Sequence, residues 1–224
     1  MSHHHPIAPF IDHTLLKADA TIGNIQTLCA EAREHGFAAV CINPYWIPTA
    51  RQALMGSDVK ICTVVGFPLG ATLSHAKVHE TQEAIVAGAD EIDVVMNIAA
   101  ALEAHWNFIE HEVHSLVSTA EGKVVKVILE TCYLNEEQIR LSCQACERAG
   151  ASFVKTSTGF GHAGATVEHV RLMRSSVSER VHVKASAGIR DEATARAMLE
   201  AGATRLGTSS GVALVTGNCS TSSY

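Results

Sequence analysis

The stretch Ala87-Gly-Ala-Asp-Glu-Ile-Asp93 decides the fold, because the chain repeats its pattern. Related stretches cover residues 35–41, 149–155 and 201–207, and in each of them a helical pattern ends at a glycine before an apolar run. A glycine just past a helix end takes the left-handed conformation at little cost, and the apolar run suits a buried parallel strand. The four glycines are 52, 62 and 52 residues apart, which is about two strand-and-helix units per interval. The pattern therefore predicts eight such units.

The spacing of apolar residues predicts where the individual strands and helices lie. Short runs rich in β-branched residues predict strands over residues 10–13, 39–43, 60–66, 91–97, 124–130, 152–157, 181–186 and 205–208. Longer periodic runs predict helices over 21–34, 46–55, 74–87, 99–120, 135–148, 167–177 and 191–200, with a short one near Gly211. This alternation predicts an α/β protein with a single-domain (β/α)8 TIM barrel over residues 8–217, a short segment 1–7 before it and a polar tail 218–224 after it. An open doubly wound sheet is the alternative, since periodicity does not show closure.

The composition excludes several classes of protein. The chain has 224 residues, 47% of them hydrophobic, and its 17 basic and 23 acidic side chains leave a net charge of −6. This balance gives no electrostatic basis for binding nucleic acid or an anionic membrane. No apolar run approaches the roughly 18 residues that span a bilayer, and the first residues do not resemble a signal peptide. Seven scattered cysteines do not form a disulfide framework. We therefore expect a cytoplasmic protein.

Polar residues near the carboxyl ends of the strands carry the functional information in such a barrel. Alternation along the expected strands places Asp93, Lys155 and Lys184 on inward faces. The two lysines lie on neighbouring strands, so their amines come close together if their heights in the barrel match. An interior ion-pair network without chemistry, like that expected for Lys126 and Glu130, is the alternative interpretation.

Two buried lysines side by side favour covalent catalysis. Burial and a neighbouring cation both lower the pKa of a lysine, and we expect one of the pair to be neutral near pH 7. Lowering the pKa from about 10.4 to about 7 requires roughly 4 to 5 kcal/mol. A neutral amine attacks a carbonyl carbon and forms a Schiff base, and a nearby carboxylate such as Asp93 can move protons.

Glycine and serine residues follow the last three expected strands. They include Gly159, Gly188, Gly207, Ser209 and Ser210. Glycine lets backbone N–H groups approach an anion, and serine hydroxyls add further donors. Because the loops after strands seven and eight are the usual phosphate site of this fold, the sequence predicts a phosphorylated substrate.

The chain resembles the deoxyribose-phosphate aldolase family of Schiff-base (class I) aldolases. Matching phrases lie on all eight expected strands in order, and the most specific are Phe153-Val-Lys-Thr-Ser-Thr-Gly-Phe160 and Val183-Lys-Ala-Ser-Ala-Gly-Ile-Arg190. The resemblance implies a (β/α)8 fold and reversible cleavage of 2-deoxy-D-ribose 5-phosphate to D-glyceraldehyde 3-phosphate and acetaldehyde. It implies that Lys155 forms the Schiff base, that Lys184 perturbs it and assists proton transfer, and that Asp93 donates and accepts protons.

The resemblance also implies partners and further contacts. Phosphate contacts come from the five glycine and serine residues after the last strands, and the partners are a small phosphorylated sugar and aldehydes. No cofactor or metal is expected, because the iminium serves as the electron sink. A homodimer or higher homo-oligomer is possible. Tyr224 could fold over the site as a proton relay, although a frayed tail is the plainer interpretation.

One departure from the family pattern stands next to an expected phosphate contact. Ala187 occupies a position where the family usually has a glycine. If that position requires a positive φ, an alanine there should weaken phosphate binding.

Two other functions are compatible with the residues alone. A different phosphosugar enzyme on the same barrel would keep the phosphate loops and change the chemistry of the second substrate. A non-catalytic sugar-phosphate binding protein would keep the loops and tolerate the loss of Lys155.

Overall fold

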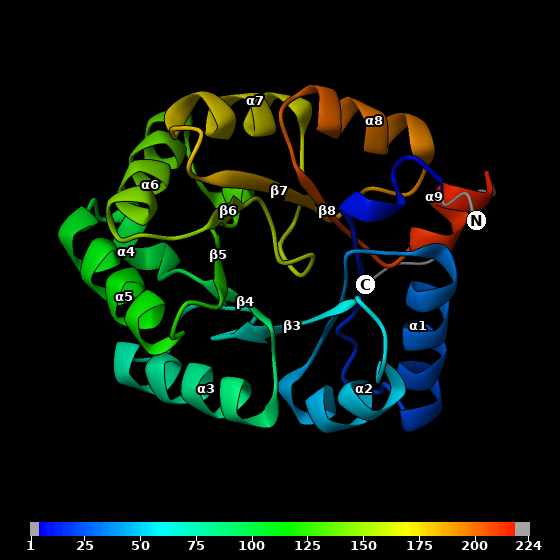
Figure 1. The fold of residues 1–224 in the computed structure, drawn as a ribbon. Helices are drawn as coiled ribbons and strands as arrows, with labels where there is room; N and C mark the ends of the chain where they lie inside the picture. The colour runs from blue at the N-terminus through cyan, green and yellow to red at the C-terminus, as the bar shows by residue number, and fades with distance from the viewer. Residues whose placement is uncertain (1–4, 218–224) are drawn as a thin grey trace.

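Eight parallel strands close into a barrel in the computed structural model, which describes residues 5–217 (Figure 1). Each strand pairs with the next, and β8 pairs with β1. The predicted (β/α)8 barrel is therefore confirmed, and the open doubly wound sheet is wrong. The strands are β1 Ile11–Leu15, β2 Ala39–Ile42, β3 Lys60–Val65, β4 Glu91–Val95, β5 Val124–Ile128, β6 Phe153–Lys155, β7 His182–Ser186 and β8 Arg205–Thr208.

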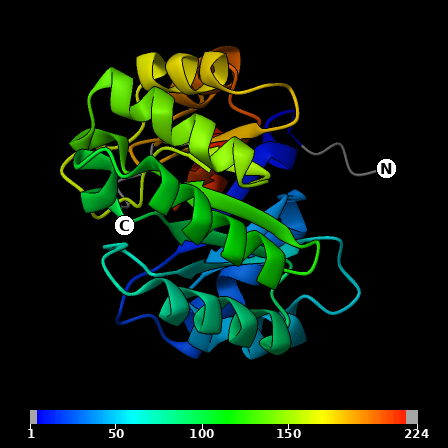
Figure 2. The same ribbon diagram turned by 90° about the vertical axis from the view of Figure 1, so that its left-hand side faces the viewer.

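Helices surround the strands on the outside of the barrel (Figures 1 and 2). None of the helices within residues 5–217 is long and apolar enough to cross a bilayer. The α-helices are α1 Ile22–His35, α2 Ile47–Ala53, α3 Ser74–Ala87, α4 Ile98–Leu102, α5 Trp106–Thr119, α6 Glu136–Arg148, α7 Val167–Ser176, α8 Glu192–Glu200 and α9 Gly211–Thr216. Three short 3-10 helices are η1 Ala8–Phe10, η2 Pro44–Trp46 and η3 Thr131–Tyr133.

Glycines end two of the helices in the way that the repeated stretches predict. Gly36 follows α1 with φ 68° and Gly88 follows α3 with φ 111°, both in the left-handed region. An L-residue with a side chain adopts this conformation only at a cost, so a glycine here stops the helix and turns the chain toward the next strand.

The single helix predicted over residues 99–120 is wrong, because two helices occupy that range. Asn97 caps α4 by accepting a hydrogen bond from the backbone N–H of Ala100 at 3.0 Å. The chain then turns at Ala104, whose φ is 56°, before α5 begins. The helical period continues through this turn, so the apolar pattern did not reveal the break.

Apolar and charged residues divide the interior of the barrel between them. Outward residues of β4, such as Ile92 and Val94, belong to the main core between strands and helices. Inside the barrel, a small apolar cluster includes Ala39 and Cys41 of β2 with Cys62 and Val64 of β3. Buried charged side chains come from β1 and from β4 to β8. The charged part of the interior therefore lies against a small apolar wall built by β2 and β3.

Candidate active site

A buried carboxylate joins three lysines inside the barrel. Asp93 is fully buried, and its Oδ2 accepts hydrogen bonds from Lys155 Nζ and Lys184 Nζ, each at 2.7 Å. Its Oδ1 accepts one from Lys126 Nζ at 2.9 Å. The strand register places Lys155 directly beside Lys184, and Asp93 beside Lys126. The two lysines of the expected pair thus have matching heights, and one carboxylate oxygen binds both amines.

Lys155 lies closest to the carboxyl end of its strand. It is the last residue of β6 and keeps 3% of its surface exposed, whereas Lys126 and Lys184 have none. Lys184 is followed by two further residues of β7, and Lys126 lies in the middle of β5. Of the three lysines, Lys155 is thus the one with part of its surface open to solvent.

The carboxylates control the charge of these amines. Burial alone would lower the pKa of Lys184, but Asp12 and Asp93 raise it well above its usual value. Burial favours protonation of Asp93, yet Lys126, Lys155 and Lys184 hold its pKa well below the usual range. One of the two adjacent lysines was expected to be neutral near pH 7, and the two carboxylates show that Lys184 is not that one. Lys184 is thus a stable cation beside Lys155, and Asp93 is a carboxylate that can accept a proton.

A second layer of charges lies beneath the lysines, and the sequence interpretation missed it. Asp12 on β1 binds Lys184 through Oδ2, and its Oδ1 accepts a hydrogen bond from Arg205 Nε at 2.7 Å. Arg205 Nη2 also donates to Glu91 Oε2 at 2.8 Å. Asp12, Glu91 and Arg205 stand at strand positions that alternation could have assigned to the interior. The carboxylates of Asp12, Glu91 and Asp93 thus lie among the amines of three lysines and the guanidinium of Arg205.

Lys126 occupies the position that a metal ion would need. Ligand atoms of Asp12, Cys62 and Glu91 lie within 4.8 Å of one another. The ammonium of Lys126 is 2.5 Å from Glu91 Oε2, 3.4 Å from Cys62 Sγ and 3.9 Å from Asp12 Oδ2. A positive charge is therefore already present between these groups.

The glycine and serine residues expected to bind phosphate have different surroundings. Gly159 and Gly188 have positive φ values of 92° and 80°. Gly207 lies within β8, where a Cβ would come 2.8 Å from Ser186 Cβ, so packing between strands also requires a glycine there. Ser209 lines a cavity of about 400 Å³ with residues of β1 and α1. Ser210 is buried, and its Oγ has no hydrogen-bond partner within residues 5–217.

Comparison with known proteins agrees with this arrangement. Residues 7–217 match the DeoC/LacD family of aldolases. The chain belongs to this family. It is 56% identical to the deoxyribose-phosphate aldolase of Deinococcus radiodurans over 94% of this chain and 96% of that protein. It is 52% identical to that of an Exiguobacterium species, over 97% of this chain and 99% of the relative.

A solved structure shares the fold of this DeoC/LacD family member. The tetrameric deoxyribose phosphate aldolase of Aeropyrum pernix superposes with a TM-score of 0.87 at 36% identity. The alignment covers 94% of this chain and 89% of that one. Sequence and structure therefore place the chain in the same family.

Ala187, the departure from the family pattern, has a left-handed backbone. Its φ is 67°, which is unfavourable for a residue with a Cβ. Gly164 lies so close that a Cβ there would come 2.4 Å from the carbonyl oxygen of Ala187. The position therefore does require a positive φ, and the chain meets this requirement with an alanine next to Gly188.

Glu130, which sequence analysis treated as a structural interior residue, supports the loop after β6. It is buried with φ 52°, and its Oε1 accepts a hydrogen bond from the backbone N–H of Thr158 at 3.1 Å. Its Oε2 accepts one from the Thr158 hydroxyl. The carboxylate thereby fixes the chain directly before Gly159. The remaining expected site residue, Tyr224, lies outside the described residues.

Proposed function

We propose that the protein is a deoxyribose-phosphate aldolase that works through a Schiff base on Lys155. It would cleave 2-deoxy-D-ribose 5-phosphate reversibly to D-glyceraldehyde 3-phosphate and acetaldehyde. Relatives that are more than half identical over nearly their whole length carry this name. The observation that best supports the lysine chemistry is the shared Oδ2 of Asp93, which accepts hydrogen bonds from both Lys155 and Lys184.

The reaction begins when Lys155 loses a proton and attacks the C1 carbonyl of the open-chain sugar. Asp93 Oδ2 is 2.7 Å from Lys155 Nζ and is the nearest carboxylate oxygen that can accept the proton. Loss of water from the carbinolamine gives an iminium at C1, which withdraws electrons from the C2–C3 bond. A base takes the proton of the C3 hydroxyl, the C2–C3 bond breaks, and D-glyceraldehyde 3-phosphate leaves. The enamine that remains is protonated at carbon and hydrolysed to acetaldehyde and free Lys155.

Lys184 and Asp93 act together in these proton transfers. Lys184 remains positively charged because Asp12 and Asp93 raise its pKa. As Asp93 accepts a proton, its attraction for Lys184 weakens, so Lys184 becomes a better proton donor. Bound water would complete the path to the substrate oxygens.

The phosphate would bind to the loops after β6, β7 and β8. Gly159, Gly188 and Gly207 would offer backbone N–H groups, and Ser209 and Ser210 would offer hydroxyls. The buried and unpartnered Oγ of Ser210 supports this role, because a polar atom in such a place usually has a partner.

Trapping the Schiff base tests the proposal. The protein is incubated with acetaldehyde and sodium borohydride, digested with trypsin and examined by mass spectrometry. We expect a two-carbon adduct on Lys155, within a peptide spanning residues 149–171, since trypsin does not cut after an alkylated lysine. The Lys155→Arg variant keeps the positive charge, cannot form the iminium and should show no adduct. An adduct confined to Lys126 or Lys184, or no adduct on any interior lysine, would contradict the proposal.

We also propose that the protein self-associates and works in the cytoplasm. The Aeropyrum pernix relative is described as a tetramer. Exposed apolar side chains, Tyr45, Leu69 and Leu73, stand in the loops after β2 and β3. The six cysteines within residues 5–217 are free thiols, the state that a reducing compartment maintains. Light scattering coupled to gel filtration should give a mass above that of one chain, and a monomer would contradict self-association.

A further inference from the structure

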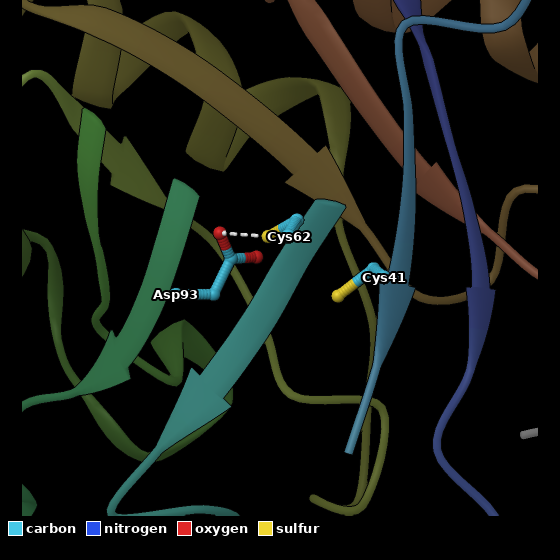
Figure 3. Close-up of side chains that lie close together, drawn as sticks. All are labelled: Cys41, Cys62 and Asp93. Carbon is cyan, nitrogen blue, oxygen red and sulfur yellow. Dashed lines mark hydrogen bonds between the residues drawn. The ribbon is translucent and has the colours of Figure 1, made fainter. Parts of the chain in front are cut away.

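Two free thiols lie side by side inside the barrel. Cys41 of β2 and Cys62 of β3 are partners in the strand register, and both are fully buried (Figure 3). Neighbouring strands lie about 4.8 Å apart, and a disulfide requires a Cα separation of about 4.4 to 6.8 Å. Both side chains point into the barrel, where the curvature of the sheet brings inward side chains together. The two sulfurs lie within 4.8 Å of each other.

The surroundings give the two thiols different protonation states. Burial raises the pKa of Cys62 well above its usual value, and neighbouring Cys41 and Asp93 raise it further. The neighbouring Cys62 and the ammonium of Lys184 lower the pKa of Cys41 although burial opposes this. Cys41 is thus the better nucleophile, and Cys62 is a protonated thiol beside it.

We propose that Cys41 and Cys62 form a reversible oxidation site that a small hydroperoxide converts to an intramolecular disulfide. The Cys41 thiolate attacks one peroxide oxygen, the O–O bond breaks, and a sulfenic acid and hydroxide form. Cys62 then attacks the sulfenic sulfur, the S–O bond breaks, and the disulfide and a second hydroxide form. The protons released by the two thiols convert both hydroxides to water. Overall, two thiols are oxidised by two electrons and one hydroperoxide is reduced.

The path to the thiols is the path to Lys155. Cys41 is the third of four residues in β2 and lies near the carboxyl end of that strand. It is close enough to Lys155 for the lysine charge to affect its pKa. Hydrogen peroxide is smaller than any aldehyde substrate, so a barrel that admits an aldehyde to Lys155 also admits the peroxide. This step rests on the proposed function, because that function requires the entry of an aldehyde.

The disulfide would disturb the carboxylate that the lysines share. The thiol of Cys62 donates a hydrogen bond to Asp93 Oδ1 at 3.0 Å (Figure 3). Its sulfur also accepts one from Lys126 Nζ at 3.4 Å. Oxidation removes the S–H donor and moves the sulfur toward Cys41. Asp93 then loses one of the groups that fix its orientation toward Lys155 and Lys184, so oxidation should reduce turnover.

Peptide mapping tests the modification without measuring catalysis. The full-length protein is treated with hydrogen peroxide, the remaining thiols are blocked and the protein is digested with trypsin. Residues 34–51 and 61–77 form two tryptic peptides that each contain a single cysteine. We expect them to be joined with the loss of two hydrogens, and to separate after treatment with dithiothreitol. Recovery of both peptides as blocked free thiols, or of sulfinic or sulfonic acids without the link, would overturn the proposal.

Matched variants test whether the disulfide between Cys41 and Cys62 controls activity. The protein should lose activity in peroxide and regain it in dithiothreitol, and the Cys132→Ser variant should behave in the same way, because Cys132 lies outside the pair. Activity of each variant is expressed as a fraction of its own untreated value. After prolonged peroxide Cys62→Ser should lose the recovery in dithiothreitol, since the Cys41 sulfenic acid has no partner thiol and is oxidised further to the sulfinic acid, which dithiothreitol does not reduce. Full recovery of Cys62→Ser would contradict the proposal, whereas absence of aldolase activity before oxidation would count against the proposed function alone.

Discussion

Replacing Asp12 with asparagine should destabilise the protein in a manner that depends on pH. Asp12 is fully buried between Lys184 and Arg205, and these cations lower its pKa from 3.8 to about 2 although burial opposes the shift. Because the folded pKa is lower than the unfolded one, the stabilisation is fully present above pH 3.8 and is lost as the pH falls toward 2. The shift corresponds to about 2.5 kcal/mol at pH 7 and to roughly half of that at pH 3.

Urea unfolding at pH 7, 5 and 3, at one protein concentration, measures this difference. We expect Asp12→Asn to lose about 2 to 4 kcal/mol of unfolding free energy at pH 7, since an amide removes the charge that Asp12 places between Lys184 and Arg205. The loss should be smaller at pH 3. Asp191→Asn is the matched control, because Asp191 is an exposed cap of α8 and asparagine also caps helices. A loss at pH 7 no greater than that of the control, or one independent of pH, would refute the reasoning.

Three further substitutions address catalysis and substrate binding. Lys184→Leu should remove most turnover at neutral pH, since it removes the cation that shares Asp93 Oδ2 with Lys155, and turnover at the original rate would show that Lys184 has no role. Ala187→Gly should raise the unfolding free energy by about 1 kcal/mol, since glycine adopts a positive φ without strain. It should also lower the KM for the phosphorylated sugar, and an unchanged KM would show that Ala187 does not affect phosphate binding. Tyr224→Phe should slow turnover if the tail takes part in proton transfer, and unchanged kinetics would exclude that role.

The barrel could be predicted from the sequence because the signals for its helix ends and strands lie within short stretches of the chain. The stretches that begin at Gly36 and Gly88 combine a helix stop with an apolar strand, and both glycines have the expected left-handed backbone. Alternation likewise predicted inward positions for Asp93 and the two lysines. The break between α4 and α5 was missed because Ala104 gives no signal of a positive φ.

Charges brought together from distant parts of the chain could not be predicted in this way. Asp12 and Arg205 are 193 residues apart in sequence and meet only because β8 pairs with β1. Asp93 was expected beside the lysines, but Asp12 was not. Burial alone would lower the pKa of Lys184, and Asp12 together with Asp93 raises it well above its usual value.

The contact between Asp12 and Arg205 also determines when the site can form as the chain is synthesised and folds. During synthesis, β1 leaves the ribosome long before β8. Asp12 therefore cannot contact Arg205 until the strands between them have been made. An incomplete chain therefore holds its interior lysines without the full set of counter-charges. Chemistry and closure of the barrel would then arise in one event, and a nascent or truncated chain would not expose a partly competent amine to the aldehydes around it.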